Sequence, residues 1–137
     1  MILVIPGKPI AKKRPRFARR GKFVTTYSDQ ETEEGKVLWE IRQQRNEKRF
    51  KGPISISLWF GMPIPKSTPR KRSQAMKNGF EQHIKKPDLD NLIKFYLDCM
   101  NQEVFEDDKQ IIILRAEKRY TDEPRTEIKI TEVEQCH

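Results

Sequence analysis

The stretch Pro53–Pro63, "PISISLWFGMP", decides the fold, because its apolar residues recur with a period of two. Successive side chains of a strand point to opposite faces, so the pattern predicts a half-buried strand with one apolar side. Four residues lie on that side: Ile54, Ile56, Leu58 and Phe60. Trp59 lies with Ser55 and Ser57 on the polar side, which favours an interface with a second chain. Trp39 is expected in the core or in an interface.

The elements around this strand indicate the fold class. Further strands are predicted at 1–5, 111–120 and 126–133, and the "DEPR" turn between the last two predicts a hairpin. One helix is predicted from a capping box of Ser28 and Glu31 to about residue 47, and another from Asp90–Asn91 to about residue 101. The order β-α-β-α-β-β indicates an α+β fold, a small mixed sheet with its helices on one face. We expect residues 1–137 to form a single domain.

The composition is strongly basic. The chain has 28 Lys and Arg against 20 Asp and Glu, a formal net charge of +8, and a pI near 9.6. Such a charge predicts a polyanionic partner, either nucleic acid or an anionic membrane surface. The early apolar run "ILVI" is too short for a signal sequence or a membrane span, which disfavours the membrane. Cys99 and Cys136 lack metal-ligand spacing, so we expect free thiols in a cytoplasmic protein and no structural zinc.

Two segments concentrate the positive charge. Residues 8–22, "KPIAKKRPRFARRGK", hold eight basic residues and no acid, and their prolines predict a basic arm rather than a helix. Residues 63–87 are predicted as a long basic loop with one helical turn around Ser73–Lys77. The expected phosphate contacts are Lys12, Lys13, Arg14, Arg16, Arg19 and Arg20 in the arm and Lys66, Arg70, Lys71 and Arg72 in the loop. Phe17 and Phe80 could stack on opened bases, although a local packing contact is the commoner role of such residues.

Asp88 and Asp90 form the first of two carboxylate pairs in this basic chain. Pro87 disfavours helix before it, so we expect "PDLD" to be extended, with both carboxylates on one side and roughly 6.6 Å between their α-carbons. Carboxylates so placed could share a hard cation. The alternative is structural: Asp90 caps the following helix at its N-cap position and Asp88 is merely solvated.

The second pair, Asp107 and Asp108, follows the predicted helix. The helix carries the chain roughly 15 Å away, and residues 102–107, if extended, return it by roughly 20 Å. One of the two aspartates can then face Asp88 and Asp90, and the other faces away. Lys94, one turn after Asp90, either pairs with a neighbouring acid or stabilises a transferring phosphoryl group.

A cluster of oxygen ligands without histidine or thiolate favours Mg²⁺ or Mn²⁺ over zinc. Neither an EF-hand nor a DxDxT phosphatase motif fits, because Leu92 and Ile93 occupy the positions that those motifs need. Basic groups that hold phosphates, next to an acidic cation site, are what phosphodiester hydrolysis requires.

The stretch "KPDLDNLIKFYLDCMNQEVFEDDKQI" closely resembles the RusA family of Holliday junction resolvases. The core of that family reads approximately D-x-D-N-L-x-K-x-x-x-D-x-L-[NT], followed by an acidic D-D before a strand. The segments "IPGKPIAKKRPR" and "PIPKS" look like the longer phage and prophage members. The resemblance implies a homodimeric, Mg²⁺- or Mn²⁺-dependent endonuclease that makes paired nicks in four-way DNA junctions.

Residue by residue, the resemblance places the catalytic, metal-binding carboxylates on Asp88, Asp90 and Asp108 and the motif lysine on Lys94. The family's Asp-Ala-Leu-Asn-Gly run departs here to Asp98-Cys99-Met100-Asn101-Gln102, without the glycine. Where some members have an arginine before the first acid, this chain has Pro87, and the charge is expected instead from Lys85 and Lys86. Two alternatives stay open: a DNA-binding module without catalysis, and a nuclease that acts on flaps or forks.

Overall fold

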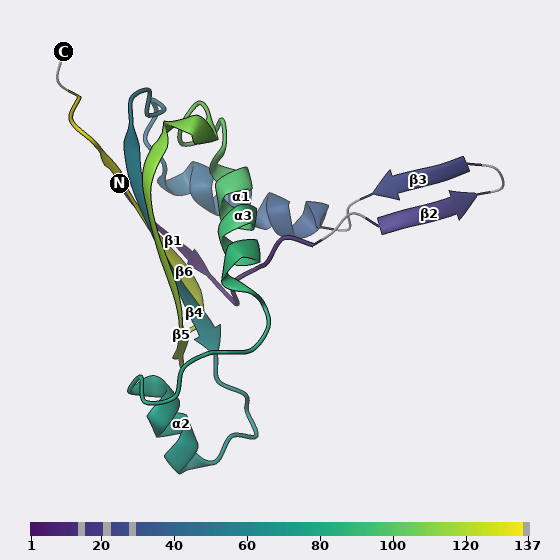
Figure 1. Ribbon diagram of the computed structural model, residues 1–137, viewed down its shortest axis with the longest axis vertical. Coiled ribbons are helices and arrows are strands. Elements are labelled where there is room, and N and C mark those ends of the chain that lie inside the picture. The colour runs from purple at the N-terminus through teal and green to yellow at the C-terminus, as the bar shows by residue number, and fades with distance from the viewer. Residues whose placement is uncertain (14–15, 21–22, 28–29, 136–137) are drawn as a thin grey trace.

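The computed structural model describes residues 1–13, 16–20, 23–27 and 30–135, with the backbone alone in the two middle ranges. Four strands form a mixed sheet: β1 (Ile2–Pro6), β4 (Ile54–Pro63), β5 (Ile111–Thr121) and β6 (Arg125–Glu132). Three α-helices accompany them: α1 (Glu31–Gln44), α2 (Arg70–Lys77) and α3 (Leu89–Met100). Figure 1 shows α1 and α3 on the same side of the sheet, which confirms the predicted α+β fold.

The strand order is β1-β6-β4-β5, so the predicted hairpin of the last two strands is wrong. β6 pairs antiparallel with β4 and with β1, while β5 pairs parallel with the other edge of β4. β4 and β6 are the two inner strands, and the alternate residues of both are buried, with Ile54, Ile56 and Phe60 of β4 at 0% exposure. The short connection 122–124 therefore passes the end of β4 rather than closing a two-stranded turn.

Helices α1 and α3 each pack into the core through one apolar face. The buried residues are Val37 and Ile41 of α1 and Leu92, Phe95, Tyr96, Cys99 and Met100 of α3. Fully burying a large apolar side chain contributes about 1.5–3 kcal/mol, so these contacts fix the rotation of α3 about its axis. α1 ends at Gln44, three residues before the predicted end, and its Trp39 is 60% exposed, so a core position for Trp39 is wrong.

The arm and the loop contain more regular structure than predicted. Residues of the arm form β2 (Arg16–Arg20), which pairs antiparallel with β3 (Phe23–Tyr27), away from the main sheet in Figure 1. The loop contains α2, a helix of eight residues in place of the predicted single turn. Ser28 of the predicted capping box lies outside the described residues, and α1 begins at Glu31 with Gln30 as its N-cap residue. In the described ranges no helix is long and apolar enough to span a membrane.

Candidate active site

Helix α3 exposes a row of charged side chains on the side that faces away from the core. Asp90, Lys94 and Asp98 are spaced by four residues, all three are exposed, and residues at this spacing neighbour one another on a helix. The orientation of the row follows from the buried face of the helix, which leaves these positions no other direction. The positively charged side chain of Lys94 is thus flanked along α3 by the carboxylates of Asp90 and Asp98.

The helix begins earlier than predicted, at Leu89, so Asp88 and not Asp90 is its N-cap residue. Asp88 is extended, with φ −68° and ψ 144°, and its side chain makes no capping hydrogen bond. Asp90 is already helical, so the prediction of an extended "PDLD" is wrong from Leu89 onward. The physical reason is that Leu89 packs against the core as part of the first helical turn.

Strand β5 holds the segment that leads to Asp88. Lys118 Nζ donates hydrogen bonds to the carbonyl oxygens of Lys85, at 2.7 Å, and Pro87, at 2.9 Å. His83 is buried, and its ring meets that of Tyr120 edge-on at 4.9 Å. Sequence reasoning missed Lys118, because a lysine in a charged edge strand carries no signal of a contact to a distant loop.

The path after α3 is also different from the predicted one. Gln102 has a φ of +67°, and its N–H donates to the carbonyl oxygen of Phe105 at 2.8 Å, so the chain turns at once instead of running extended. Gln102 occupies the position at which the family motif has glycine, a residue that adopts positive φ without steric cost. The turn forms because it buries Val104 and Phe105, both of which reach the core.

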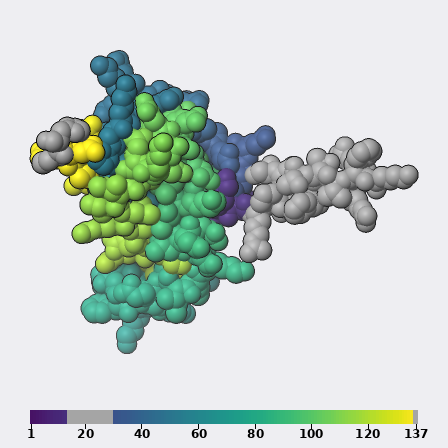
Figure 2. All heavy atoms as spheres, turned by 45° about the horizontal axis from the view of Figure 1, so that its top comes forward, coloured from purple at the N-terminus to yellow at the C-terminus, as the bar shows by residue number. Residues whose placement is uncertain are grey.

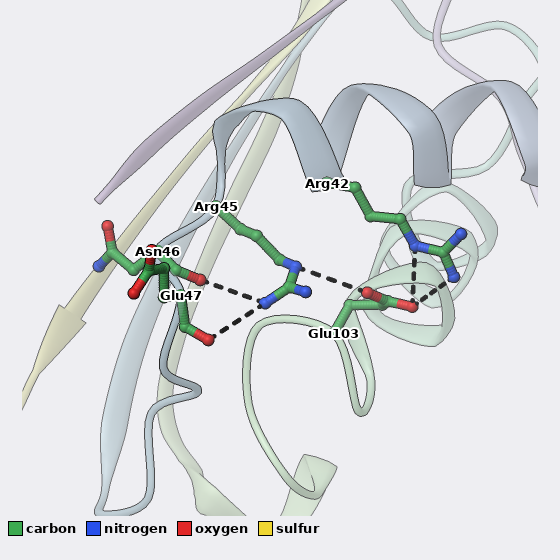
Figure 3. A network of polar contacts seen from close by, with 5 residues as sticks. All are labelled: Arg42, Arg45, Asn46, Glu47 and Glu103. Atoms are coloured by element: carbon green, nitrogen blue, oxygen red, sulfur yellow. Dashed lines mark hydrogen bonds and ion pairs between the residues drawn. The ribbon is translucent and has the colours of Figure 1, made fainter.

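Ion pairs from α1 fix this turn in place (Figure 3). Arg42 Nη2 lies 2.7 Å from Glu103 Oε1, and Arg45 Nε lies 3.7 Å from Glu103 Oε2. The hydrogen bond from Arg42 holds the pKa of Glu103 below its usual value. The turn that leads to the second carboxylate pair is therefore anchored to a different helix from the one that it follows.

Within the second pair, the two aspartates have different roles. Asp107 Oδ1 accepts from Lys109 N at 2.9 Å, while Gln110 Oε1 accepts from Asp107 N at 2.8 Å, a capping box on the short helix 108–110. Asp108 makes no such contact. The charges acting on its carboxyl are those of Asp98, Asp107 and Lys94, so Asp108 approaches the later turns of α3.

The pKa of Asp108 is raised, first by loss of solvent around its carboxyl and then by the negative charges of Asp98 and Asp107, while Lys94 lowers it. Its ionised form is thus less favourable in the folded than in the unfolded chain. This cost is absent below pH 3.8, the ordinary aspartate value, and develops as the pH rises through the raised pKa. The site therefore stores unfavourable negative charge at neutral pH, which is what a cation-binding position requires.

Asp108→Asn should therefore raise the free energy of unfolding at pH 7, because it removes the cost of a partly desolvated charge and the repulsion from Asp98 and Asp107 without changing the side-chain shape. The gain should shrink as the pH falls toward 3.8. Urea unfolding of both proteins at a series of pH values measures it. An equal or lower stability of Asp108→Asn at pH 7 would contradict the electrostatic description of this position.

In the part of the chain that the structure describes, no three His, Cys, Asp or Glu side chains are close enough together to hold a metal ion. Asp88, Asp90 and Asp108 therefore do not form such a cluster in the structure, and their role as metal ligands stays a prediction. Mg²⁺ is commonly held by one or two protein carboxylates, with substrate phosphates and water completing its shell. Asp88 and Asp90, two residues apart at the start of α3, are two such carboxylates.

The predicted phosphate contacts fall into several groups. Lys12 is attached to α3, because its N–H donates to the carbonyl oxygen of Asn91 at 2.9 Å and its Nζ lies 3.3 Å from Asp98. Lys13 pairs with Glu33 at 3.4 Å. The predicted phosphate contacts in the loop are all exposed: Lys66, Arg70, Lys71, Arg72, Lys85 and Lys86, of which Arg72 pairs with Glu81 at 2.9 Å. Arg14 and the side chains of Arg16, Phe17, Arg19 and Arg20 lie outside the described residues.

A groove of about 560 Å³ runs from Pro87, next to Asp88, along the N-terminal segment. Its basic residues are Lys8, Lys12, Lys13, Lys36 and Lys86, and the acid among its lining residues is Glu33, which pairs with Lys13. Figure 2 shows the described N-terminal segment, in purple, against the teal-green surface that contains α3. We refer to this cavity as the lysine groove. Sequence reasoning missed Lys8 and Lys36, since 27 residues separate them and only the fold brings them together.

Phe80 is 84% exposed, so a local packing role for it is wrong. It follows α2 in the loop, where the backbone N–H of Phe80 donates to the carbonyl oxygen of Ala75 at 2.9 Å. The ring is therefore presented to solvent from an ordered turn. Base stacking at this position stays a prediction.

The sequence matches the family described as endodeoxyribonuclease RusA over residues 6–131. It is also 33% identical over 131 residues to an uncharacterized protein, YqaN, of Bacillus subtilis (strain 168), a match that covers 93% of this chain and 92% of that protein. The matched range contains α3, both carboxylate pairs and the residues of the lysine groove.

Proposed function

The chain belongs to the RusA family of endodeoxyribonucleases, and from this premise we propose that it resolves four-way DNA junctions by paired, symmetric nicks. The observation that carries the proposal is the position of the acidic residues of α3 beside the lysine groove, so that one surface offers both cation ligands and phosphate contacts. The proposed setting is recombination and repair of DNA in the bacterial cytoplasm, in a prophage or a chromosomal context.

Asp88, Asp90 and Asp108 are the proposed ligands of Mg²⁺ or Mn²⁺. When bound, the ion would lower the pKa of a water molecule and stabilise the charge on the leaving oxygen. Lys94 supplies positive charge to the phosphate from the middle of the α3 row. The lysine groove holds the DNA backbone, which the bare carboxylates would otherwise repel.

The proposed active protein is a homodimer, because a four-way junction has two-fold symmetry and two symmetric cuts need two related sites. The face of the sheet opposite α1 and α3 supports this. Across the strands, Lys129 and Arg115 flank Ser57, and in the next row Glu127 and Glu117 flank Trp59. Each glutamate also pairs with an arginine of its own strand, Arg125 at 3.7 Å and Arg119 at 3.3 Å. A two-fold axis that runs across the strands between these rows sets the basic row of one copy over the acidic row of the other.

The dimer proposal predicts that Glu117→Lys with Glu127→Lys converts the protein to a monomer, because like charges then meet across the interface. Light scattering during gel filtration gives the mass. Arg115→Glu with Lys129→Glu should have the same effect, and an equimolar mixture of the two variants should restore a dimer. A monomeric wild type, or a double variant that remains dimeric, would refute this interface.

A panel of DNA substrates tests the proposed activity against its alternatives. We expect efficient cleavage of a mobile four-way junction and little cleavage of a linear duplex with the same sequence. A faster reaction on 5′ flaps or replication forks would favour a structure-selective nuclease of another kind. Tight junction binding with no cleavage in either Mg²⁺ or Mn²⁺ would favour a DNA-binding module.

A further inference from the structure

The lysine groove continues into a second cavity of about 670 Å³, which shares Lys8, Ile10 and Lys36 with it. This second cavity is mainly apolar, and Trp39 is one of its lining residues with 60% of its surface exposed. A tryptophan so exposed is unusual on a helix whose opposite face reaches the core. The two cavities together form a path from Pro87, beside Asp88, to the indole of Trp39.

Two segments form the walls of this second cavity, which we call the tryptophan cavity. One is the solvent-facing side of α1, with Thr32, Gly35, Lys36 and Trp39 at helical spacing. The other is the chain that leaves β1, where Gly7 turns with a φ of +96° and its N–H donates to the carbonyl oxygen of Pro124 at 3.1 Å.

The floor of the cavity is tied to α3. Ile10 N donates to the hydroxyl of Tyr96 at 3.0 Å, and Tyr96 is almost fully buried. Gly35 leaves the wall open, because a Cβ built at this position would meet no atom within 4 Å. The cavity is thus a formed feature of the fold with room beside the indole.

We propose that this cavity takes one unpaired nucleobase, stacked on Trp39, from a DNA strand whose phosphates lie over Lys8 and Lys36. The inference rests on the proposed function and specifies which part of the substrate it recognises. Stacking on an aromatic side chain suits any base, since every base has a π-face, and a basic groove that follows the backbone accompanies such platforms. Lys8 and Lys36 outnumber Glu40 among the residues that line this cavity, and Lys86 adds positive charge in the adjoining lysine groove. This charge favours a nucleic acid over an apolar peptide.

The same site explains selectivity for branched DNA. In a continuous duplex each base is already stacked on its neighbours, and removing it from the stack costs free energy. At a branch point the bases next to the crossover are more easily unstacked, so the stacking gain at Trp39 is largest there. Trp39 then contributes to junction affinity and little to duplex affinity.

The test compares the affinities of wild type, Trp39→Ala and Trp39→Phe for a four-way junction and a matched duplex in Ca²⁺, which is expected to permit binding without cleavage. We expect Trp39→Ala to weaken junction binding roughly tenfold or more while duplex binding changes less than twofold. Trp39→Phe should recover most of the loss. Lys36→Ala should weaken both complexes, as a phosphate contact does. Thermal unfolding of each variant checks that it is folded.

A second arm replaces each nucleotide next to the branch point, one at a time, with an abasic one. At the stacked position the abasic site should weaken binding by wild type but not by Trp39→Ala. If Trp39→Ala binds the junction like wild type, or if no abasic position couples to Trp39, the inference fails. Cleavage is scored separately: a wild type that shows the coupling without cutting refutes the proposed nuclease, while cutting without the coupling refutes the stacking site alone.

Discussion

We expect Asp90→Asn to lower the rate of junction cleavage by about a thousandfold and to leave junction affinity within a few-fold of wild type. Asp90 is exposed in the first turn of α3, so the isosteric amide preserves the fold while it removes one anionic oxygen donor. A catalytic metal contributes several kcal/mol of transition-state stabilisation, and each tenfold in rate corresponds to about 1.4 kcal/mol. Binding should persist because, in the proposed complex, the lysine groove rather than the carboxylates contacts the phosphates.

The chain offers a matched control for the carboxylate variants in Asp107. Because the Asp107 side chain caps the helix 108–110, Asp107→Asn keeps the position polar and should leave the cleavage rate within about tenfold of wild type. Asp108→Asn should lose cleavage as Asp90→Asn does. Single-turnover rates on an end-labelled junction separate these outcomes. If Asp90→Asn cleaves within tenfold of wild type, Asp90 is not a catalytic ligand.

Lys94→Met lowers the cleavage rate by roughly a hundredfold or more, the second largest effect that we expect. Lys94 is the cation between Asp90 and Asp98, and its charge lowers the pKa of Asp108. Without that charge the pKa of Asp108 rises further, so the acidic limb of the pH–rate profile should move to higher pH. A residue with only a structural role would not move this limb.

Lys94→Arg should recover part of the rate, because it keeps the charge with a different shape. Lys51→Met is the control for general loss of positive charge, since Lys51 is exposed just before β4 and lines neither the lysine groove nor the tryptophan cavity. It should leave the profile unchanged. An unaltered pH–rate profile in Lys94→Met would remove Lys94 from the site.

Much of the fold follows from local patterns in the sequence. The alternation in β4 specifies an element and its buried side, and this prediction is confirmed; the helix predicted from Asp90–Asn91 to about residue 101 is also present, as α3. The pairing of β5 and β6 could not be predicted in the same way, because it depends on which strand gains most from the centre of the sheet. The turn at Gln102 could not be predicted for a related reason. The burial of Phe105 in the core compensates the steric cost of the positive φ of Gln102, and that burial depends on long-range contacts.

The candidate site was predictable only in part, for the same reason: local spacing points to some of its residues, and long-range contacts bring in the others. Motif spacing pointed to the acids of α3 and predicted that only one of Asp107 and Asp108 faces the first pair. Asp107 has a capping role in the structure, and the catalytic roles of the acids stay predictions. Spacing could not reveal Lys8, Lys36 or Lys118, since each approaches the site from a distant segment. The extended return to the N-terminus of α3 was wrong because the geometry assumed no intervening turn.

The most direct test of metal-dependent resolution follows end-labelled four-way junction DNA with excess wild-type protein, first in EDTA and then after addition of Mg²⁺ or Mn²⁺. We predict a bound but intact junction in EDTA. After the ion is added, two nicks should appear at symmetric positions in opposing strands and release two ligatable duplexes. A junction that stays bound and intact at every concentration of either ion, or that is cut equally well in EDTA, would contradict the proposed mechanism.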